Sequence, residues 1–206
     1  MPEIDLSAID LSVKFLGKPL AAPMMIGAMT GGTIRAEAIN RALAAVAQDH
    51  KIAFAVGSQR AALELGKTAS DLRIIAPDIP IIGNLGGIQL AQSGGIDLAK
   101  AAINDLQADA IAIHLNPLQE AVQPEGEHDW HGVRDAIAAL VKADIAPVIV
   151  KEVGAGISAS LASDLFACGV AAVDVAGFGH RRSEIDRANA EGRDRAHRVG
   201  RSDAVH

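Results

Sequence analysis

Short apolar segments recur along the chain at nearly even spacing, and each ends in a small or polar residue. Helix-like segments rich in Ala and Leu separate them. Strands that are apolar on both faces and alternate with helices, at about 30 residues per unit, indicate parallel βαβ packing. The sequence therefore predicts an α/β fold with about six βα units, whose strands begin near Pro23, Ile52, Ile79, Ala108, Ala146 and Val170. The predicted helices cover residues 33–49, 59–73 with a break allowed, 88–107, 131–144 and 158–168.

Two architectures fit this pattern, an open doubly wound sheet and a (β/α)8 TIM barrel. No G-x-G-x-x-G follows the first predicted strand, although that motif is typical of doubly wound dinucleotide-binding folds. Polar residues end nearly every predicted strand, namely Thr30, Ser58, Asn84, His114 with Asn116, Lys151 with Glu152, and Asp174. In a barrel these ends meet at one active-site face. We therefore expect a fold of the (β/α)8 family that is incomplete, because about six of roughly eight units are present.

The composition excludes several classes of function. With 206 residues, of which 50% are apolar and 21% charged, the chain has enough material for one large core. Aromatic residues make up 2% and the net charge is -6, so no nucleic-acid partner is expected. Cys168 is the single cysteine, which excludes an internal disulfide and fits a reducing cytoplasm. No signal peptide and no run of about 18 apolar residues is visible, so no membrane insertion is expected.

Residues 180–206 differ from the rest of the chain. They hold 7 Arg, no Lys and 5 acidic residues, and they lack the spaced apolar residues of a packed helix or strand. We interpret this Arg-rich segment as a disordered, solvated tail. Because acids are interleaved with the arginines, a basic arm for an anionic partner is the less favoured interpretation. The predicted organisation is therefore a partial barrel over residues 1–179 and a tail over residues 180–206.

The segment from His114 to Trp130 carries the strongest signal for chemistry. It leaves a predicted strand, turns at Pro117 and places a histidine, two amides and a carboxylate within seven residues. An ordinary connection would be about two to six residues long. Glu120 is suited to Mg²⁺, which prefers oxygen ligands and keeps waters and phosphates around one carboxylate; a solvated loop acid is the alternative. His114 is either a site residue or a hydrogen-bonded core histidine.

Lys151 lies inside the apolar run VIVKEVGAG. A buried lysine needs an anion or a lowered pKa, so we expect a catalytic amine or the partner of a negative ligand. An ion pair with Glu152 is the alternative, but neighbours on one strand point to opposite faces. GAMTGGT, from Gly27 to Thr33, suits close approach by a flat cofactor, although a Gly-rich loop alone is a weak signal. Asn84 in GNLGG is either a ligand or a turn residue.

Six motifs, taken together and in their order along the chain, match the pattern of one family. They are GAMTGGT, VGSQRAAL, GNLGG, HLNPLQEAVQPEGEHDW, VIVKEVGAGIS and VDVAG. The sequence resembles the type 2 isopentenyl-diphosphate delta-isomerases, flavin-dependent (β/α)8 enzymes that interconvert isopentenyl and dimethylallyl diphosphate. The likeness runs from Phe15 to Gly177. The loop around Gln119 and Glu120 is specific to that family, whereas the lysine strand and the polar strand ends occur in other FMN barrels.

The resemblance implies a role for each matching position. Gln119 would be a catalytic residue that contacts the substrate near the reacting alkene, with His114 and Asn116 in the same substrate pocket. Glu120 would bind a Mg²⁺ that bridges to the diphosphate. Lys151 would lie beside the pyrimidine edge of the flavin and stabilise the reduced ring. The remaining FMN contacts would be Ala28, Met29, Thr30, Ser58 and Asn84.

The implied reaction moves a double bond without net redox change, so reduced FMN would act in proton transfer. The resemblance also implies NADPH to reduce the flavin, a small diphosphate as substrate, and a homo-oligomer where the barrel is complete. The basic, histidine-containing start of the family has no match here, and FGHRRSEID stands where the family continues with two further βα units. We therefore expect a chain truncated at both ends, with impaired flavin binding and activity.

Two other functions stay open. An FMN-barrel oxidoreductase acting on a hydroxy acid or a nucleotide would use Lys151 and Asn84 equally well. Such enzymes usually need a late histidine or cysteine, and Cys168 lies in a helix pattern as a small apolar residue. A non-catalytic remnant, which pairs its open sheet edge with another chain, follows from the missing barrel units.

Overall fold

The computed structural model describes residues 3–29, 34–66, 69 and 71–176. Within them, all six predicted strands form one parallel sheet whose spatial order follows the sequence. Each strand pairs in parallel with the next one along the chain. The strands are β3 (Met25–Ile26), β4 (Ala53–Ala55), β5 (Ile81–Gly86), β6 (Ala110–Leu115), β7 (Val148–Glu152) and β8 (Ala172–Asp174).

The predicted helices are confirmed, two of them as broken pairs. The helix predicted at 59–73 corresponds to α2 (Arg60–Glu64) and α3 (Asp71–Ile75), and the one predicted at 88–107 corresponds to α4 (Gly87–Ala91) and α5 (Gly95–Leu106). The second break was not expected; it lies at Gly94, which has a φ of 82°, a conformation that favours glycine. The other helices are α1 (Ile34–His50), α7 (Val133–Lys142) and α8 (Ala159–Ala167).

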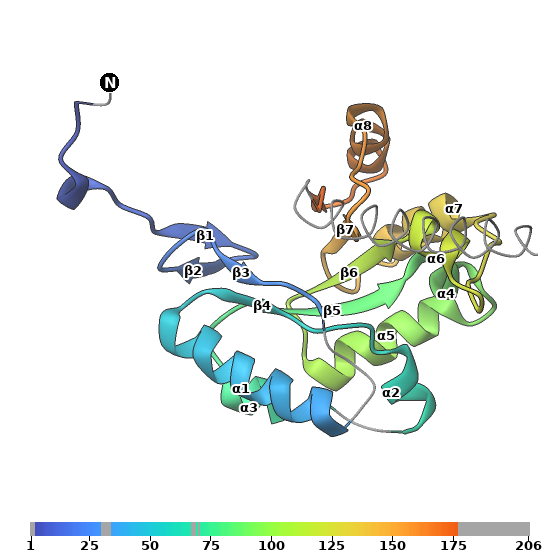
Figure 1. Ribbon diagram of the computed structural model, residues 1–206, viewed down its shortest axis with the longest axis horizontal. Helices are drawn as coiled ribbons and strands as arrows, with labels where there is room; N and C mark the ends of the chain where they lie inside the picture. The colour runs from blue at the N-terminus through green and yellow to red at the C-terminus, as the bar shows by residue number, and fades with distance from the viewer. Residues whose placement is uncertain (1–2, 30–33, 67–68, 70, 177–206) are drawn as a thin grey trace, which may run out of the picture.

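The sheet is curled, as in consecutive strands of a (β/α)8 barrel (Figure 1). Its outer face packs against helices through a large apolar cluster that includes Leu85, Ile113 and Val150. Its inner face carries a smaller apolar cluster, in which three of the five buried residues are alanines: Ala55, Ile82, Ala110, Ala112 and Ile149. The strand order, which follows the sequence without the reversal of a doubly wound sheet, confirms the predicted barrel architecture.

A β-hairpin and two short helices were not predicted. The hairpin joins β1 (Val13–Phe15) to β2 (Lys18–Leu20), and Phe15 and Leu16 pack against the inner apolar cluster of the sheet. The short helices are η1 (Leu6–Ala8) and α6 (Pro117–Val122). Pro117, expected to make a turn, is instead the first residue of α6, a position that tolerates proline because its N–H would be unpaired in any case.

Asp109 ties the hairpin to the barrel. Its carboxylate lies 2.8 Å from Lys18 Nζ on β2 and 2.6 Å from Arg73 Nη2 on α3, and it accepts the backbone N–H of Ile81 at 2.8 Å. Burial alone would raise the pKa of this carboxyl. The hydrogen bonds from Lys18, the Ile81 amide and Arg73 outweigh that effect and lower its pKa.

The α8 helix stands apart from the helices that cover the sheet (Figure 1). Ser158 caps it, since its Oγ accepts the Leu161 N–H at 3.2 Å, and Leu165 is its one buried residue. In the part of the chain described here, no helix is long and apolar enough to cross a membrane. The predicted tail, residues 180–206, and the end of the predicted barrel domain at residue 179 lie outside the described residues.

Candidate functional site

The polar strand ends of β5, β6 and β7 share the inner face of the curled sheet. His114 on β6 pairs with Lys151 on β7, which pairs in turn with Asp174 on β8. Side chains at paired positions of parallel strands point to the same face. Asn84 pairs with Ala112, two residues before His114, so its side chain lies on that face as well. The register therefore brings four of the predicted polar strand ends to one face.

His114 and Asn84 are in direct contact. His114 Nδ1 lies 2.8 Å from Asn84 Oδ1. The pKa of His114 is lowered from 6.5 to about 4, first by burial and then by the positive charges of Lys151 and Arg60, with Glu120 acting in the opposite direction. The imidazole is therefore neutral at physiological pH.

Lys151 and Glu152 leave β7 on opposite faces. Lys151 is half-buried, and its Nζ donates to the backbone oxygen of Glu152 at 2.7 Å. The Glu152 carboxylate, 4% exposed, accepts the backbone N–H groups of Gly154, Ala155 and Gly156. None of the ion pairs among the described residues includes Lys151. Its Nζ at the inner face is therefore hydrogen-bonded to a backbone oxygen and to no carboxylate of the described residues.

Asn116, Gln119 and Glu120 form a second group at the start of α6. Asn116 Nδ2 donates to Glu120 Oε1 at 2.7 Å and lies 3.4 Å from Gln119 Oε1. Glu120 Oε2 accepts the backbone N–H of Glu127 at 2.8 Å. Each carboxylate oxygen thus has one hydrogen bond and an unused lone pair. Among the described residues, no group of three or more His, Cys, Asp or Glu side chains could hold a metal ion.

The other predicted cofactor contacts lie along the neighbouring strands. Ala28, after β3, packs against the inner apolar cluster. Met29 is 72% exposed, and Ser58, after β4, is exposed as well. Among the described residues, neither side chain makes a hydrogen bond to Asn84, His114 or Lys151. Thr30 lies outside the described residues.

Three polar residues at this end of the barrel were missed by sequence reasoning. Gln59 is 5% exposed and bonds to both the N–H and the C=O of Asn84. Arg60 lies close enough to lower the pKa of His114, and its Nη1 is 3.5 Å from Glu127 Oε2. Glu127 also accepts a hydrogen bond from Gln89 on α4. Gln59 and Arg60 could have been found from their position directly after the second predicted strand.

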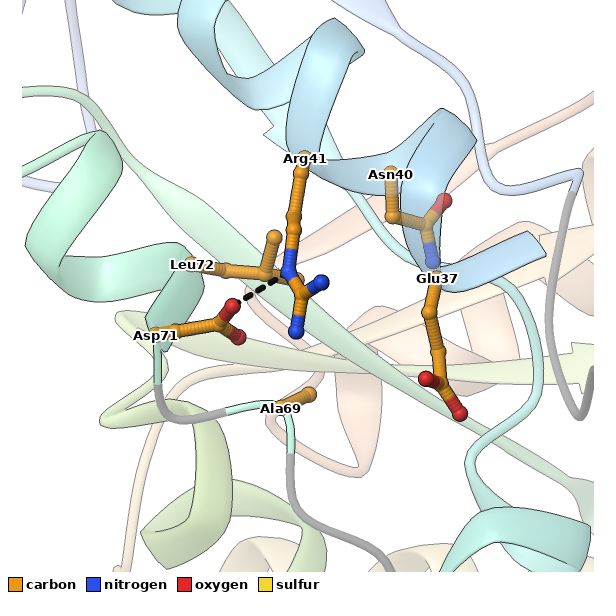
Figure 2. A pocket seen from close by; sticks show the side chains of 6 residues that line it. All are labelled: Glu37, Asn40, Arg41, Ala69, Asp71 and Leu72. Atoms are coloured by element: carbon orange, nitrogen blue, oxygen red, sulfur yellow. Dashed lines mark hydrogen bonds and ion pairs between the residues drawn. The ribbon is translucent and has the colours of Figure 1, made fainter. Parts of the chain in front are cut away.

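A small cavity lies elsewhere, between α1 and α3 (Figure 2). The Arg41 guanidinium reaches across it to the Asp71 carboxylate. The cavity contains none of the predicted site residues, and its lining is Glu37, Asn40, Arg41, Ala69, Asp71 and Leu72.

No protein-family model matches the chain. Curated relatives, however, match most of it. An isopentenyl-diphosphate delta-isomerase of Xanthobacter autotrophicus is 54% identical over 182 residues, which are 87% of this chain and 53% of that protein. The chain is similar to isopentenyl-diphosphate delta-isomerases. The corresponding isomerases of Stutzerimonas stutzeri and a Synechocystis species are 51% and 50% identical, each over 87% of this chain. The chain spans about half the length of these isomerases.

Solved structures support the fold independently. A mandelate oxidase variant with a C4a-OH-FMN adduct matches 84% of this chain and 54% of its own, with a TM-score of 0.58 and 14% identity. A second mandelate oxidase variant, with benzoyl-formic acid, gives a TM-score of 0.57 at 15% identity. At this identity the likeness concerns the fold alone.

Proposed function

We propose that the protein is a type 2, flavin-dependent isopentenyl-diphosphate delta-isomerase, which converts isopentenyl diphosphate to dimethylallyl diphosphate. The observation that carries the proposal is the 54% identity over 182 residues to a curated isomerase. The matched region contains the strand-end residues His114, Asn84 and Lys151. Mg²⁺, FMN and NADPH as its reductant complete the proposal. A cytoplasmic location and a homo-oligomeric state stay predictions.

The inner face of the sheet offers a flavin suitable polar and charged groups. Three of the five buried residues in the inner cluster are alanines, so few bulky side chains rise from that face of the strands. The Asn84 amide on β5 and the Lys151 ammonium on β7 lie on the same face of the sheet, with His114 of β6 between them. A cation without a carboxylate partner is suited to the negative charge of a reduced flavin. When bound, reduced FMN would supply the proton transfer.

Glu120 fits Mg²⁺ as a single protein ligand. Mg²⁺ commonly takes one or two carboxylates and fills its other positions with waters and substrate phosphates. Asn116 holds one oxygen of Glu120 and the Glu127 amide holds the other, so the carboxylate is oriented while lone pairs stay free. Arg60 and Lys151 add positive charge on the same side of the barrel, which favours a diphosphate.

The chain's own residues would then orient the substrate. Gln119 lies beside Asn116 and, on this proposal, contacts the alkene end, while Glu120 draws the diphosphate through the metal. His114 is neutral at pH 7 and so presents no competing positive charge to the metal. Phe15 and Leu16 close the inner face at the hairpin and reduce the access of water from that side.

The test uses the chain and a chimera in which residues 1–176 replace the matching part of the Xanthobacter isomerase. Each is supplied with FMN, NADPH, Mg²⁺ and isopentenyl diphosphate under anaerobic conditions, and dimethylallyl diphosphate is measured by mass spectrometry. We expect turnover by the chimera. Replacement Glu120→Gln in the chimera is expected to reduce turnover about 100-fold, because a metal ligand is lost.

The matched control is Glu125→Gln, which changes an exposed acid five residues away and is expected to leave turnover unchanged. A folded, flavin-loaded chimera that does not isomerise the substrate contradicts the proposal. Flavin reduction by a hydroxy acid in that same chimera would point to an oxidoreductase instead. Full turnover by Glu120→Gln would remove the metal assignment alone.

A further inference from the structure

Gln59 makes a set of contacts that continues the sheet beyond the end of β4. Its backbone N–H donates to Asn84 O at 2.9 Å, and its side-chain Oε1 accepts the Asn84 N–H at 3.0 Å. Its Nε2 donates to Ala102 O on α5 at 3.1 Å. The Gln59 side chain thus accepts the Asn84 N–H as the backbone of a neighbouring strand would. It also links Asn84 to α5.

The adjoining glycine shows how closely this side chain approaches β5. A Cβ built on Gly83 would lie 2.8 Å from Gln59 Oε1, closer than such contacts occur in proteins. The buried position of Gln59, at 5% exposure, makes each of its hydrogen bonds costly to lose. The peptide of Asn84 is therefore held on both its donor and its acceptor.

The held residue determines the hydrogen-bonding state of His114. Asn84 Oδ1 can only accept a hydrogen bond, so His114 Nδ1, at 2.8 Å from it, carries the proton. Nε2 is then left with a free lone pair, next to Gly86. Within the described residues, the imidazole has no second hydrogen-bond partner.

We propose that Gln59 is a positioning residue which, through Asn84, keeps His114 in its Nδ1–H form and leaves Nε2 as a neutral hydrogen-bond acceptor at the inner face. The consequence for catalysis rests on the proposed function, because the ligand of Nε2 would be the isomerase substrate or its cofactor. The tautomer itself does not depend on that function.

The charged groups around His114 change its pKa, whereas the hydrogen bond to Asn84 sets which ring nitrogen carries the proton. Lys151 faces it from β7 and Arg60 from α2, and both oppose a positive imidazole. Glu120 faces it from α6 and favours the positive form. None of these three residues is substituted in the Gln59 variants, and none shares a hydrogen bond with the Gln59 side chain, whose partners are the Asn84 N–H and the Ala102 oxygen.

The test is nuclear magnetic resonance of the whole chain labelled with isotopic histidine, at neutral pH and without flavin or substrate. The His114 signals are assigned from their loss in His114→Gln. We expect the wild-type ring to show Nδ1 protonated and Nε2 unprotonated. In Gln59→Leu we expect the Nδ1–H signal to be lost in favour of the Nε2–H form, while Gln59→Glu retains Nδ1–H because it keeps the acceptor for the Asn84 amide.

Gln123→Leu, which alters an exposed glutamine near α6, is the matched control and is expected to leave the tautomer unchanged. If Gln59→Leu does not fold, Gln59→Asn decides, since its amide is one carbon too short to reach the Asn84 N–H. A folded Gln59→Leu or Gln59→Asn chain that keeps Nδ1–H overturns the proposal. Because no substrate is used, an inactive enzyme with the expected tautomers would count against the proposed function only.

Discussion

His114 couples the candidate site to the stability of the fold. Its pKa is about 4 in the folded chain against 6.5 for an ordinary histidine, so between these values the unfolded chain binds more protons. The resulting stability is complete above pH 6.5 and is lost as the pH falls towards 4. We expect His114 to account for about 2 to 3 kcal/mol of the stability lost between pH 7 and pH 4.5.

Urea denaturation of the wild type and of His114→Gln at the two pH values checks this prediction. The variant is expected to lose less stability on acidification, by the amount given above. His128→Gln, which changes an exposed imidazole, is the control and should behave like the wild type. Equal losses in the wild type and in His114→Gln would show that the folded chain binds this proton as readily as the unfolded one.

The sequence was sufficient to predict the charged site residues, but not the residues that position their neighbours. Lys151 was identifiable because a charge inside an apolar run needs an explanation, and Glu120 because its loop resembles that of a known family. Nothing in the sequence predicted a role for Gln59, because a glutamine that follows a strand is commonly exposed to solvent. Its importance arises from a contact with Asn84, 25 residues away, which only the folded chain shows.

At the scale of elements, the break between α4 and α5 makes Gly95 hard to replace. A Cβ on Gly95 would lie 2.0 Å from the Leu90 carbonyl oxygen, and backbone cannot move aside as a flexible side chain can. We expect Gly95→Ala to lower the free energy of unfolding by about 3 kcal/mol. The measurement is chemical denaturation, with Gly27→Ala as the control because a Cβ there meets nothing within 4 Å. Similar values for the two variants would contradict the prediction.

The long elements followed from the sequence, whereas the short ones did not. The fully buried strand β5 appears in the sequence as one apolar run, which is why its position was predictable. The hairpin strands β1 and β2 have three residues each, too few to show an alternating pattern. They are held to the barrel by contacts that are distant in sequence, namely the packing of Phe15 and Leu16 on the inner cluster and the ion pair of Lys18 with Asp109, 91 positions away. Pro117 was misassigned because proline fits both a turn and the first turn of a helix.

At the scale of the whole molecule, the contacts are concentrated in the middle of the sheet. Every residue of β5 is buried, and β5 pairs with β6 over five residues, whereas α8 buries Leu165 alone. We expect the amides of β5 and β6 to exchange with solvent deuterium most slowly and those of α8 much faster, because local opening of α8 exposes little apolar surface. Hydrogen exchange followed by mass spectrometry measures both. Equal protection of α8 and β5 would contradict this order.

The alternation of side chains along β7 has a consequence for how this fold tolerates insertions. Val150 and Glu152 face the helices, while Ile149 and Lys151 face the interior. An extra residue early in β7 would exchange these two sets, since side chains repeat every second residue. The ammonium would then point into the helix layer and the carboxylate would point inward. With the same amino acids, β7 would then present a carboxylate to the barrel interior in place of an ammonium. The sign of the charge that this strand contributes to the site therefore depends on whether the strand gains an even or an odd number of residues.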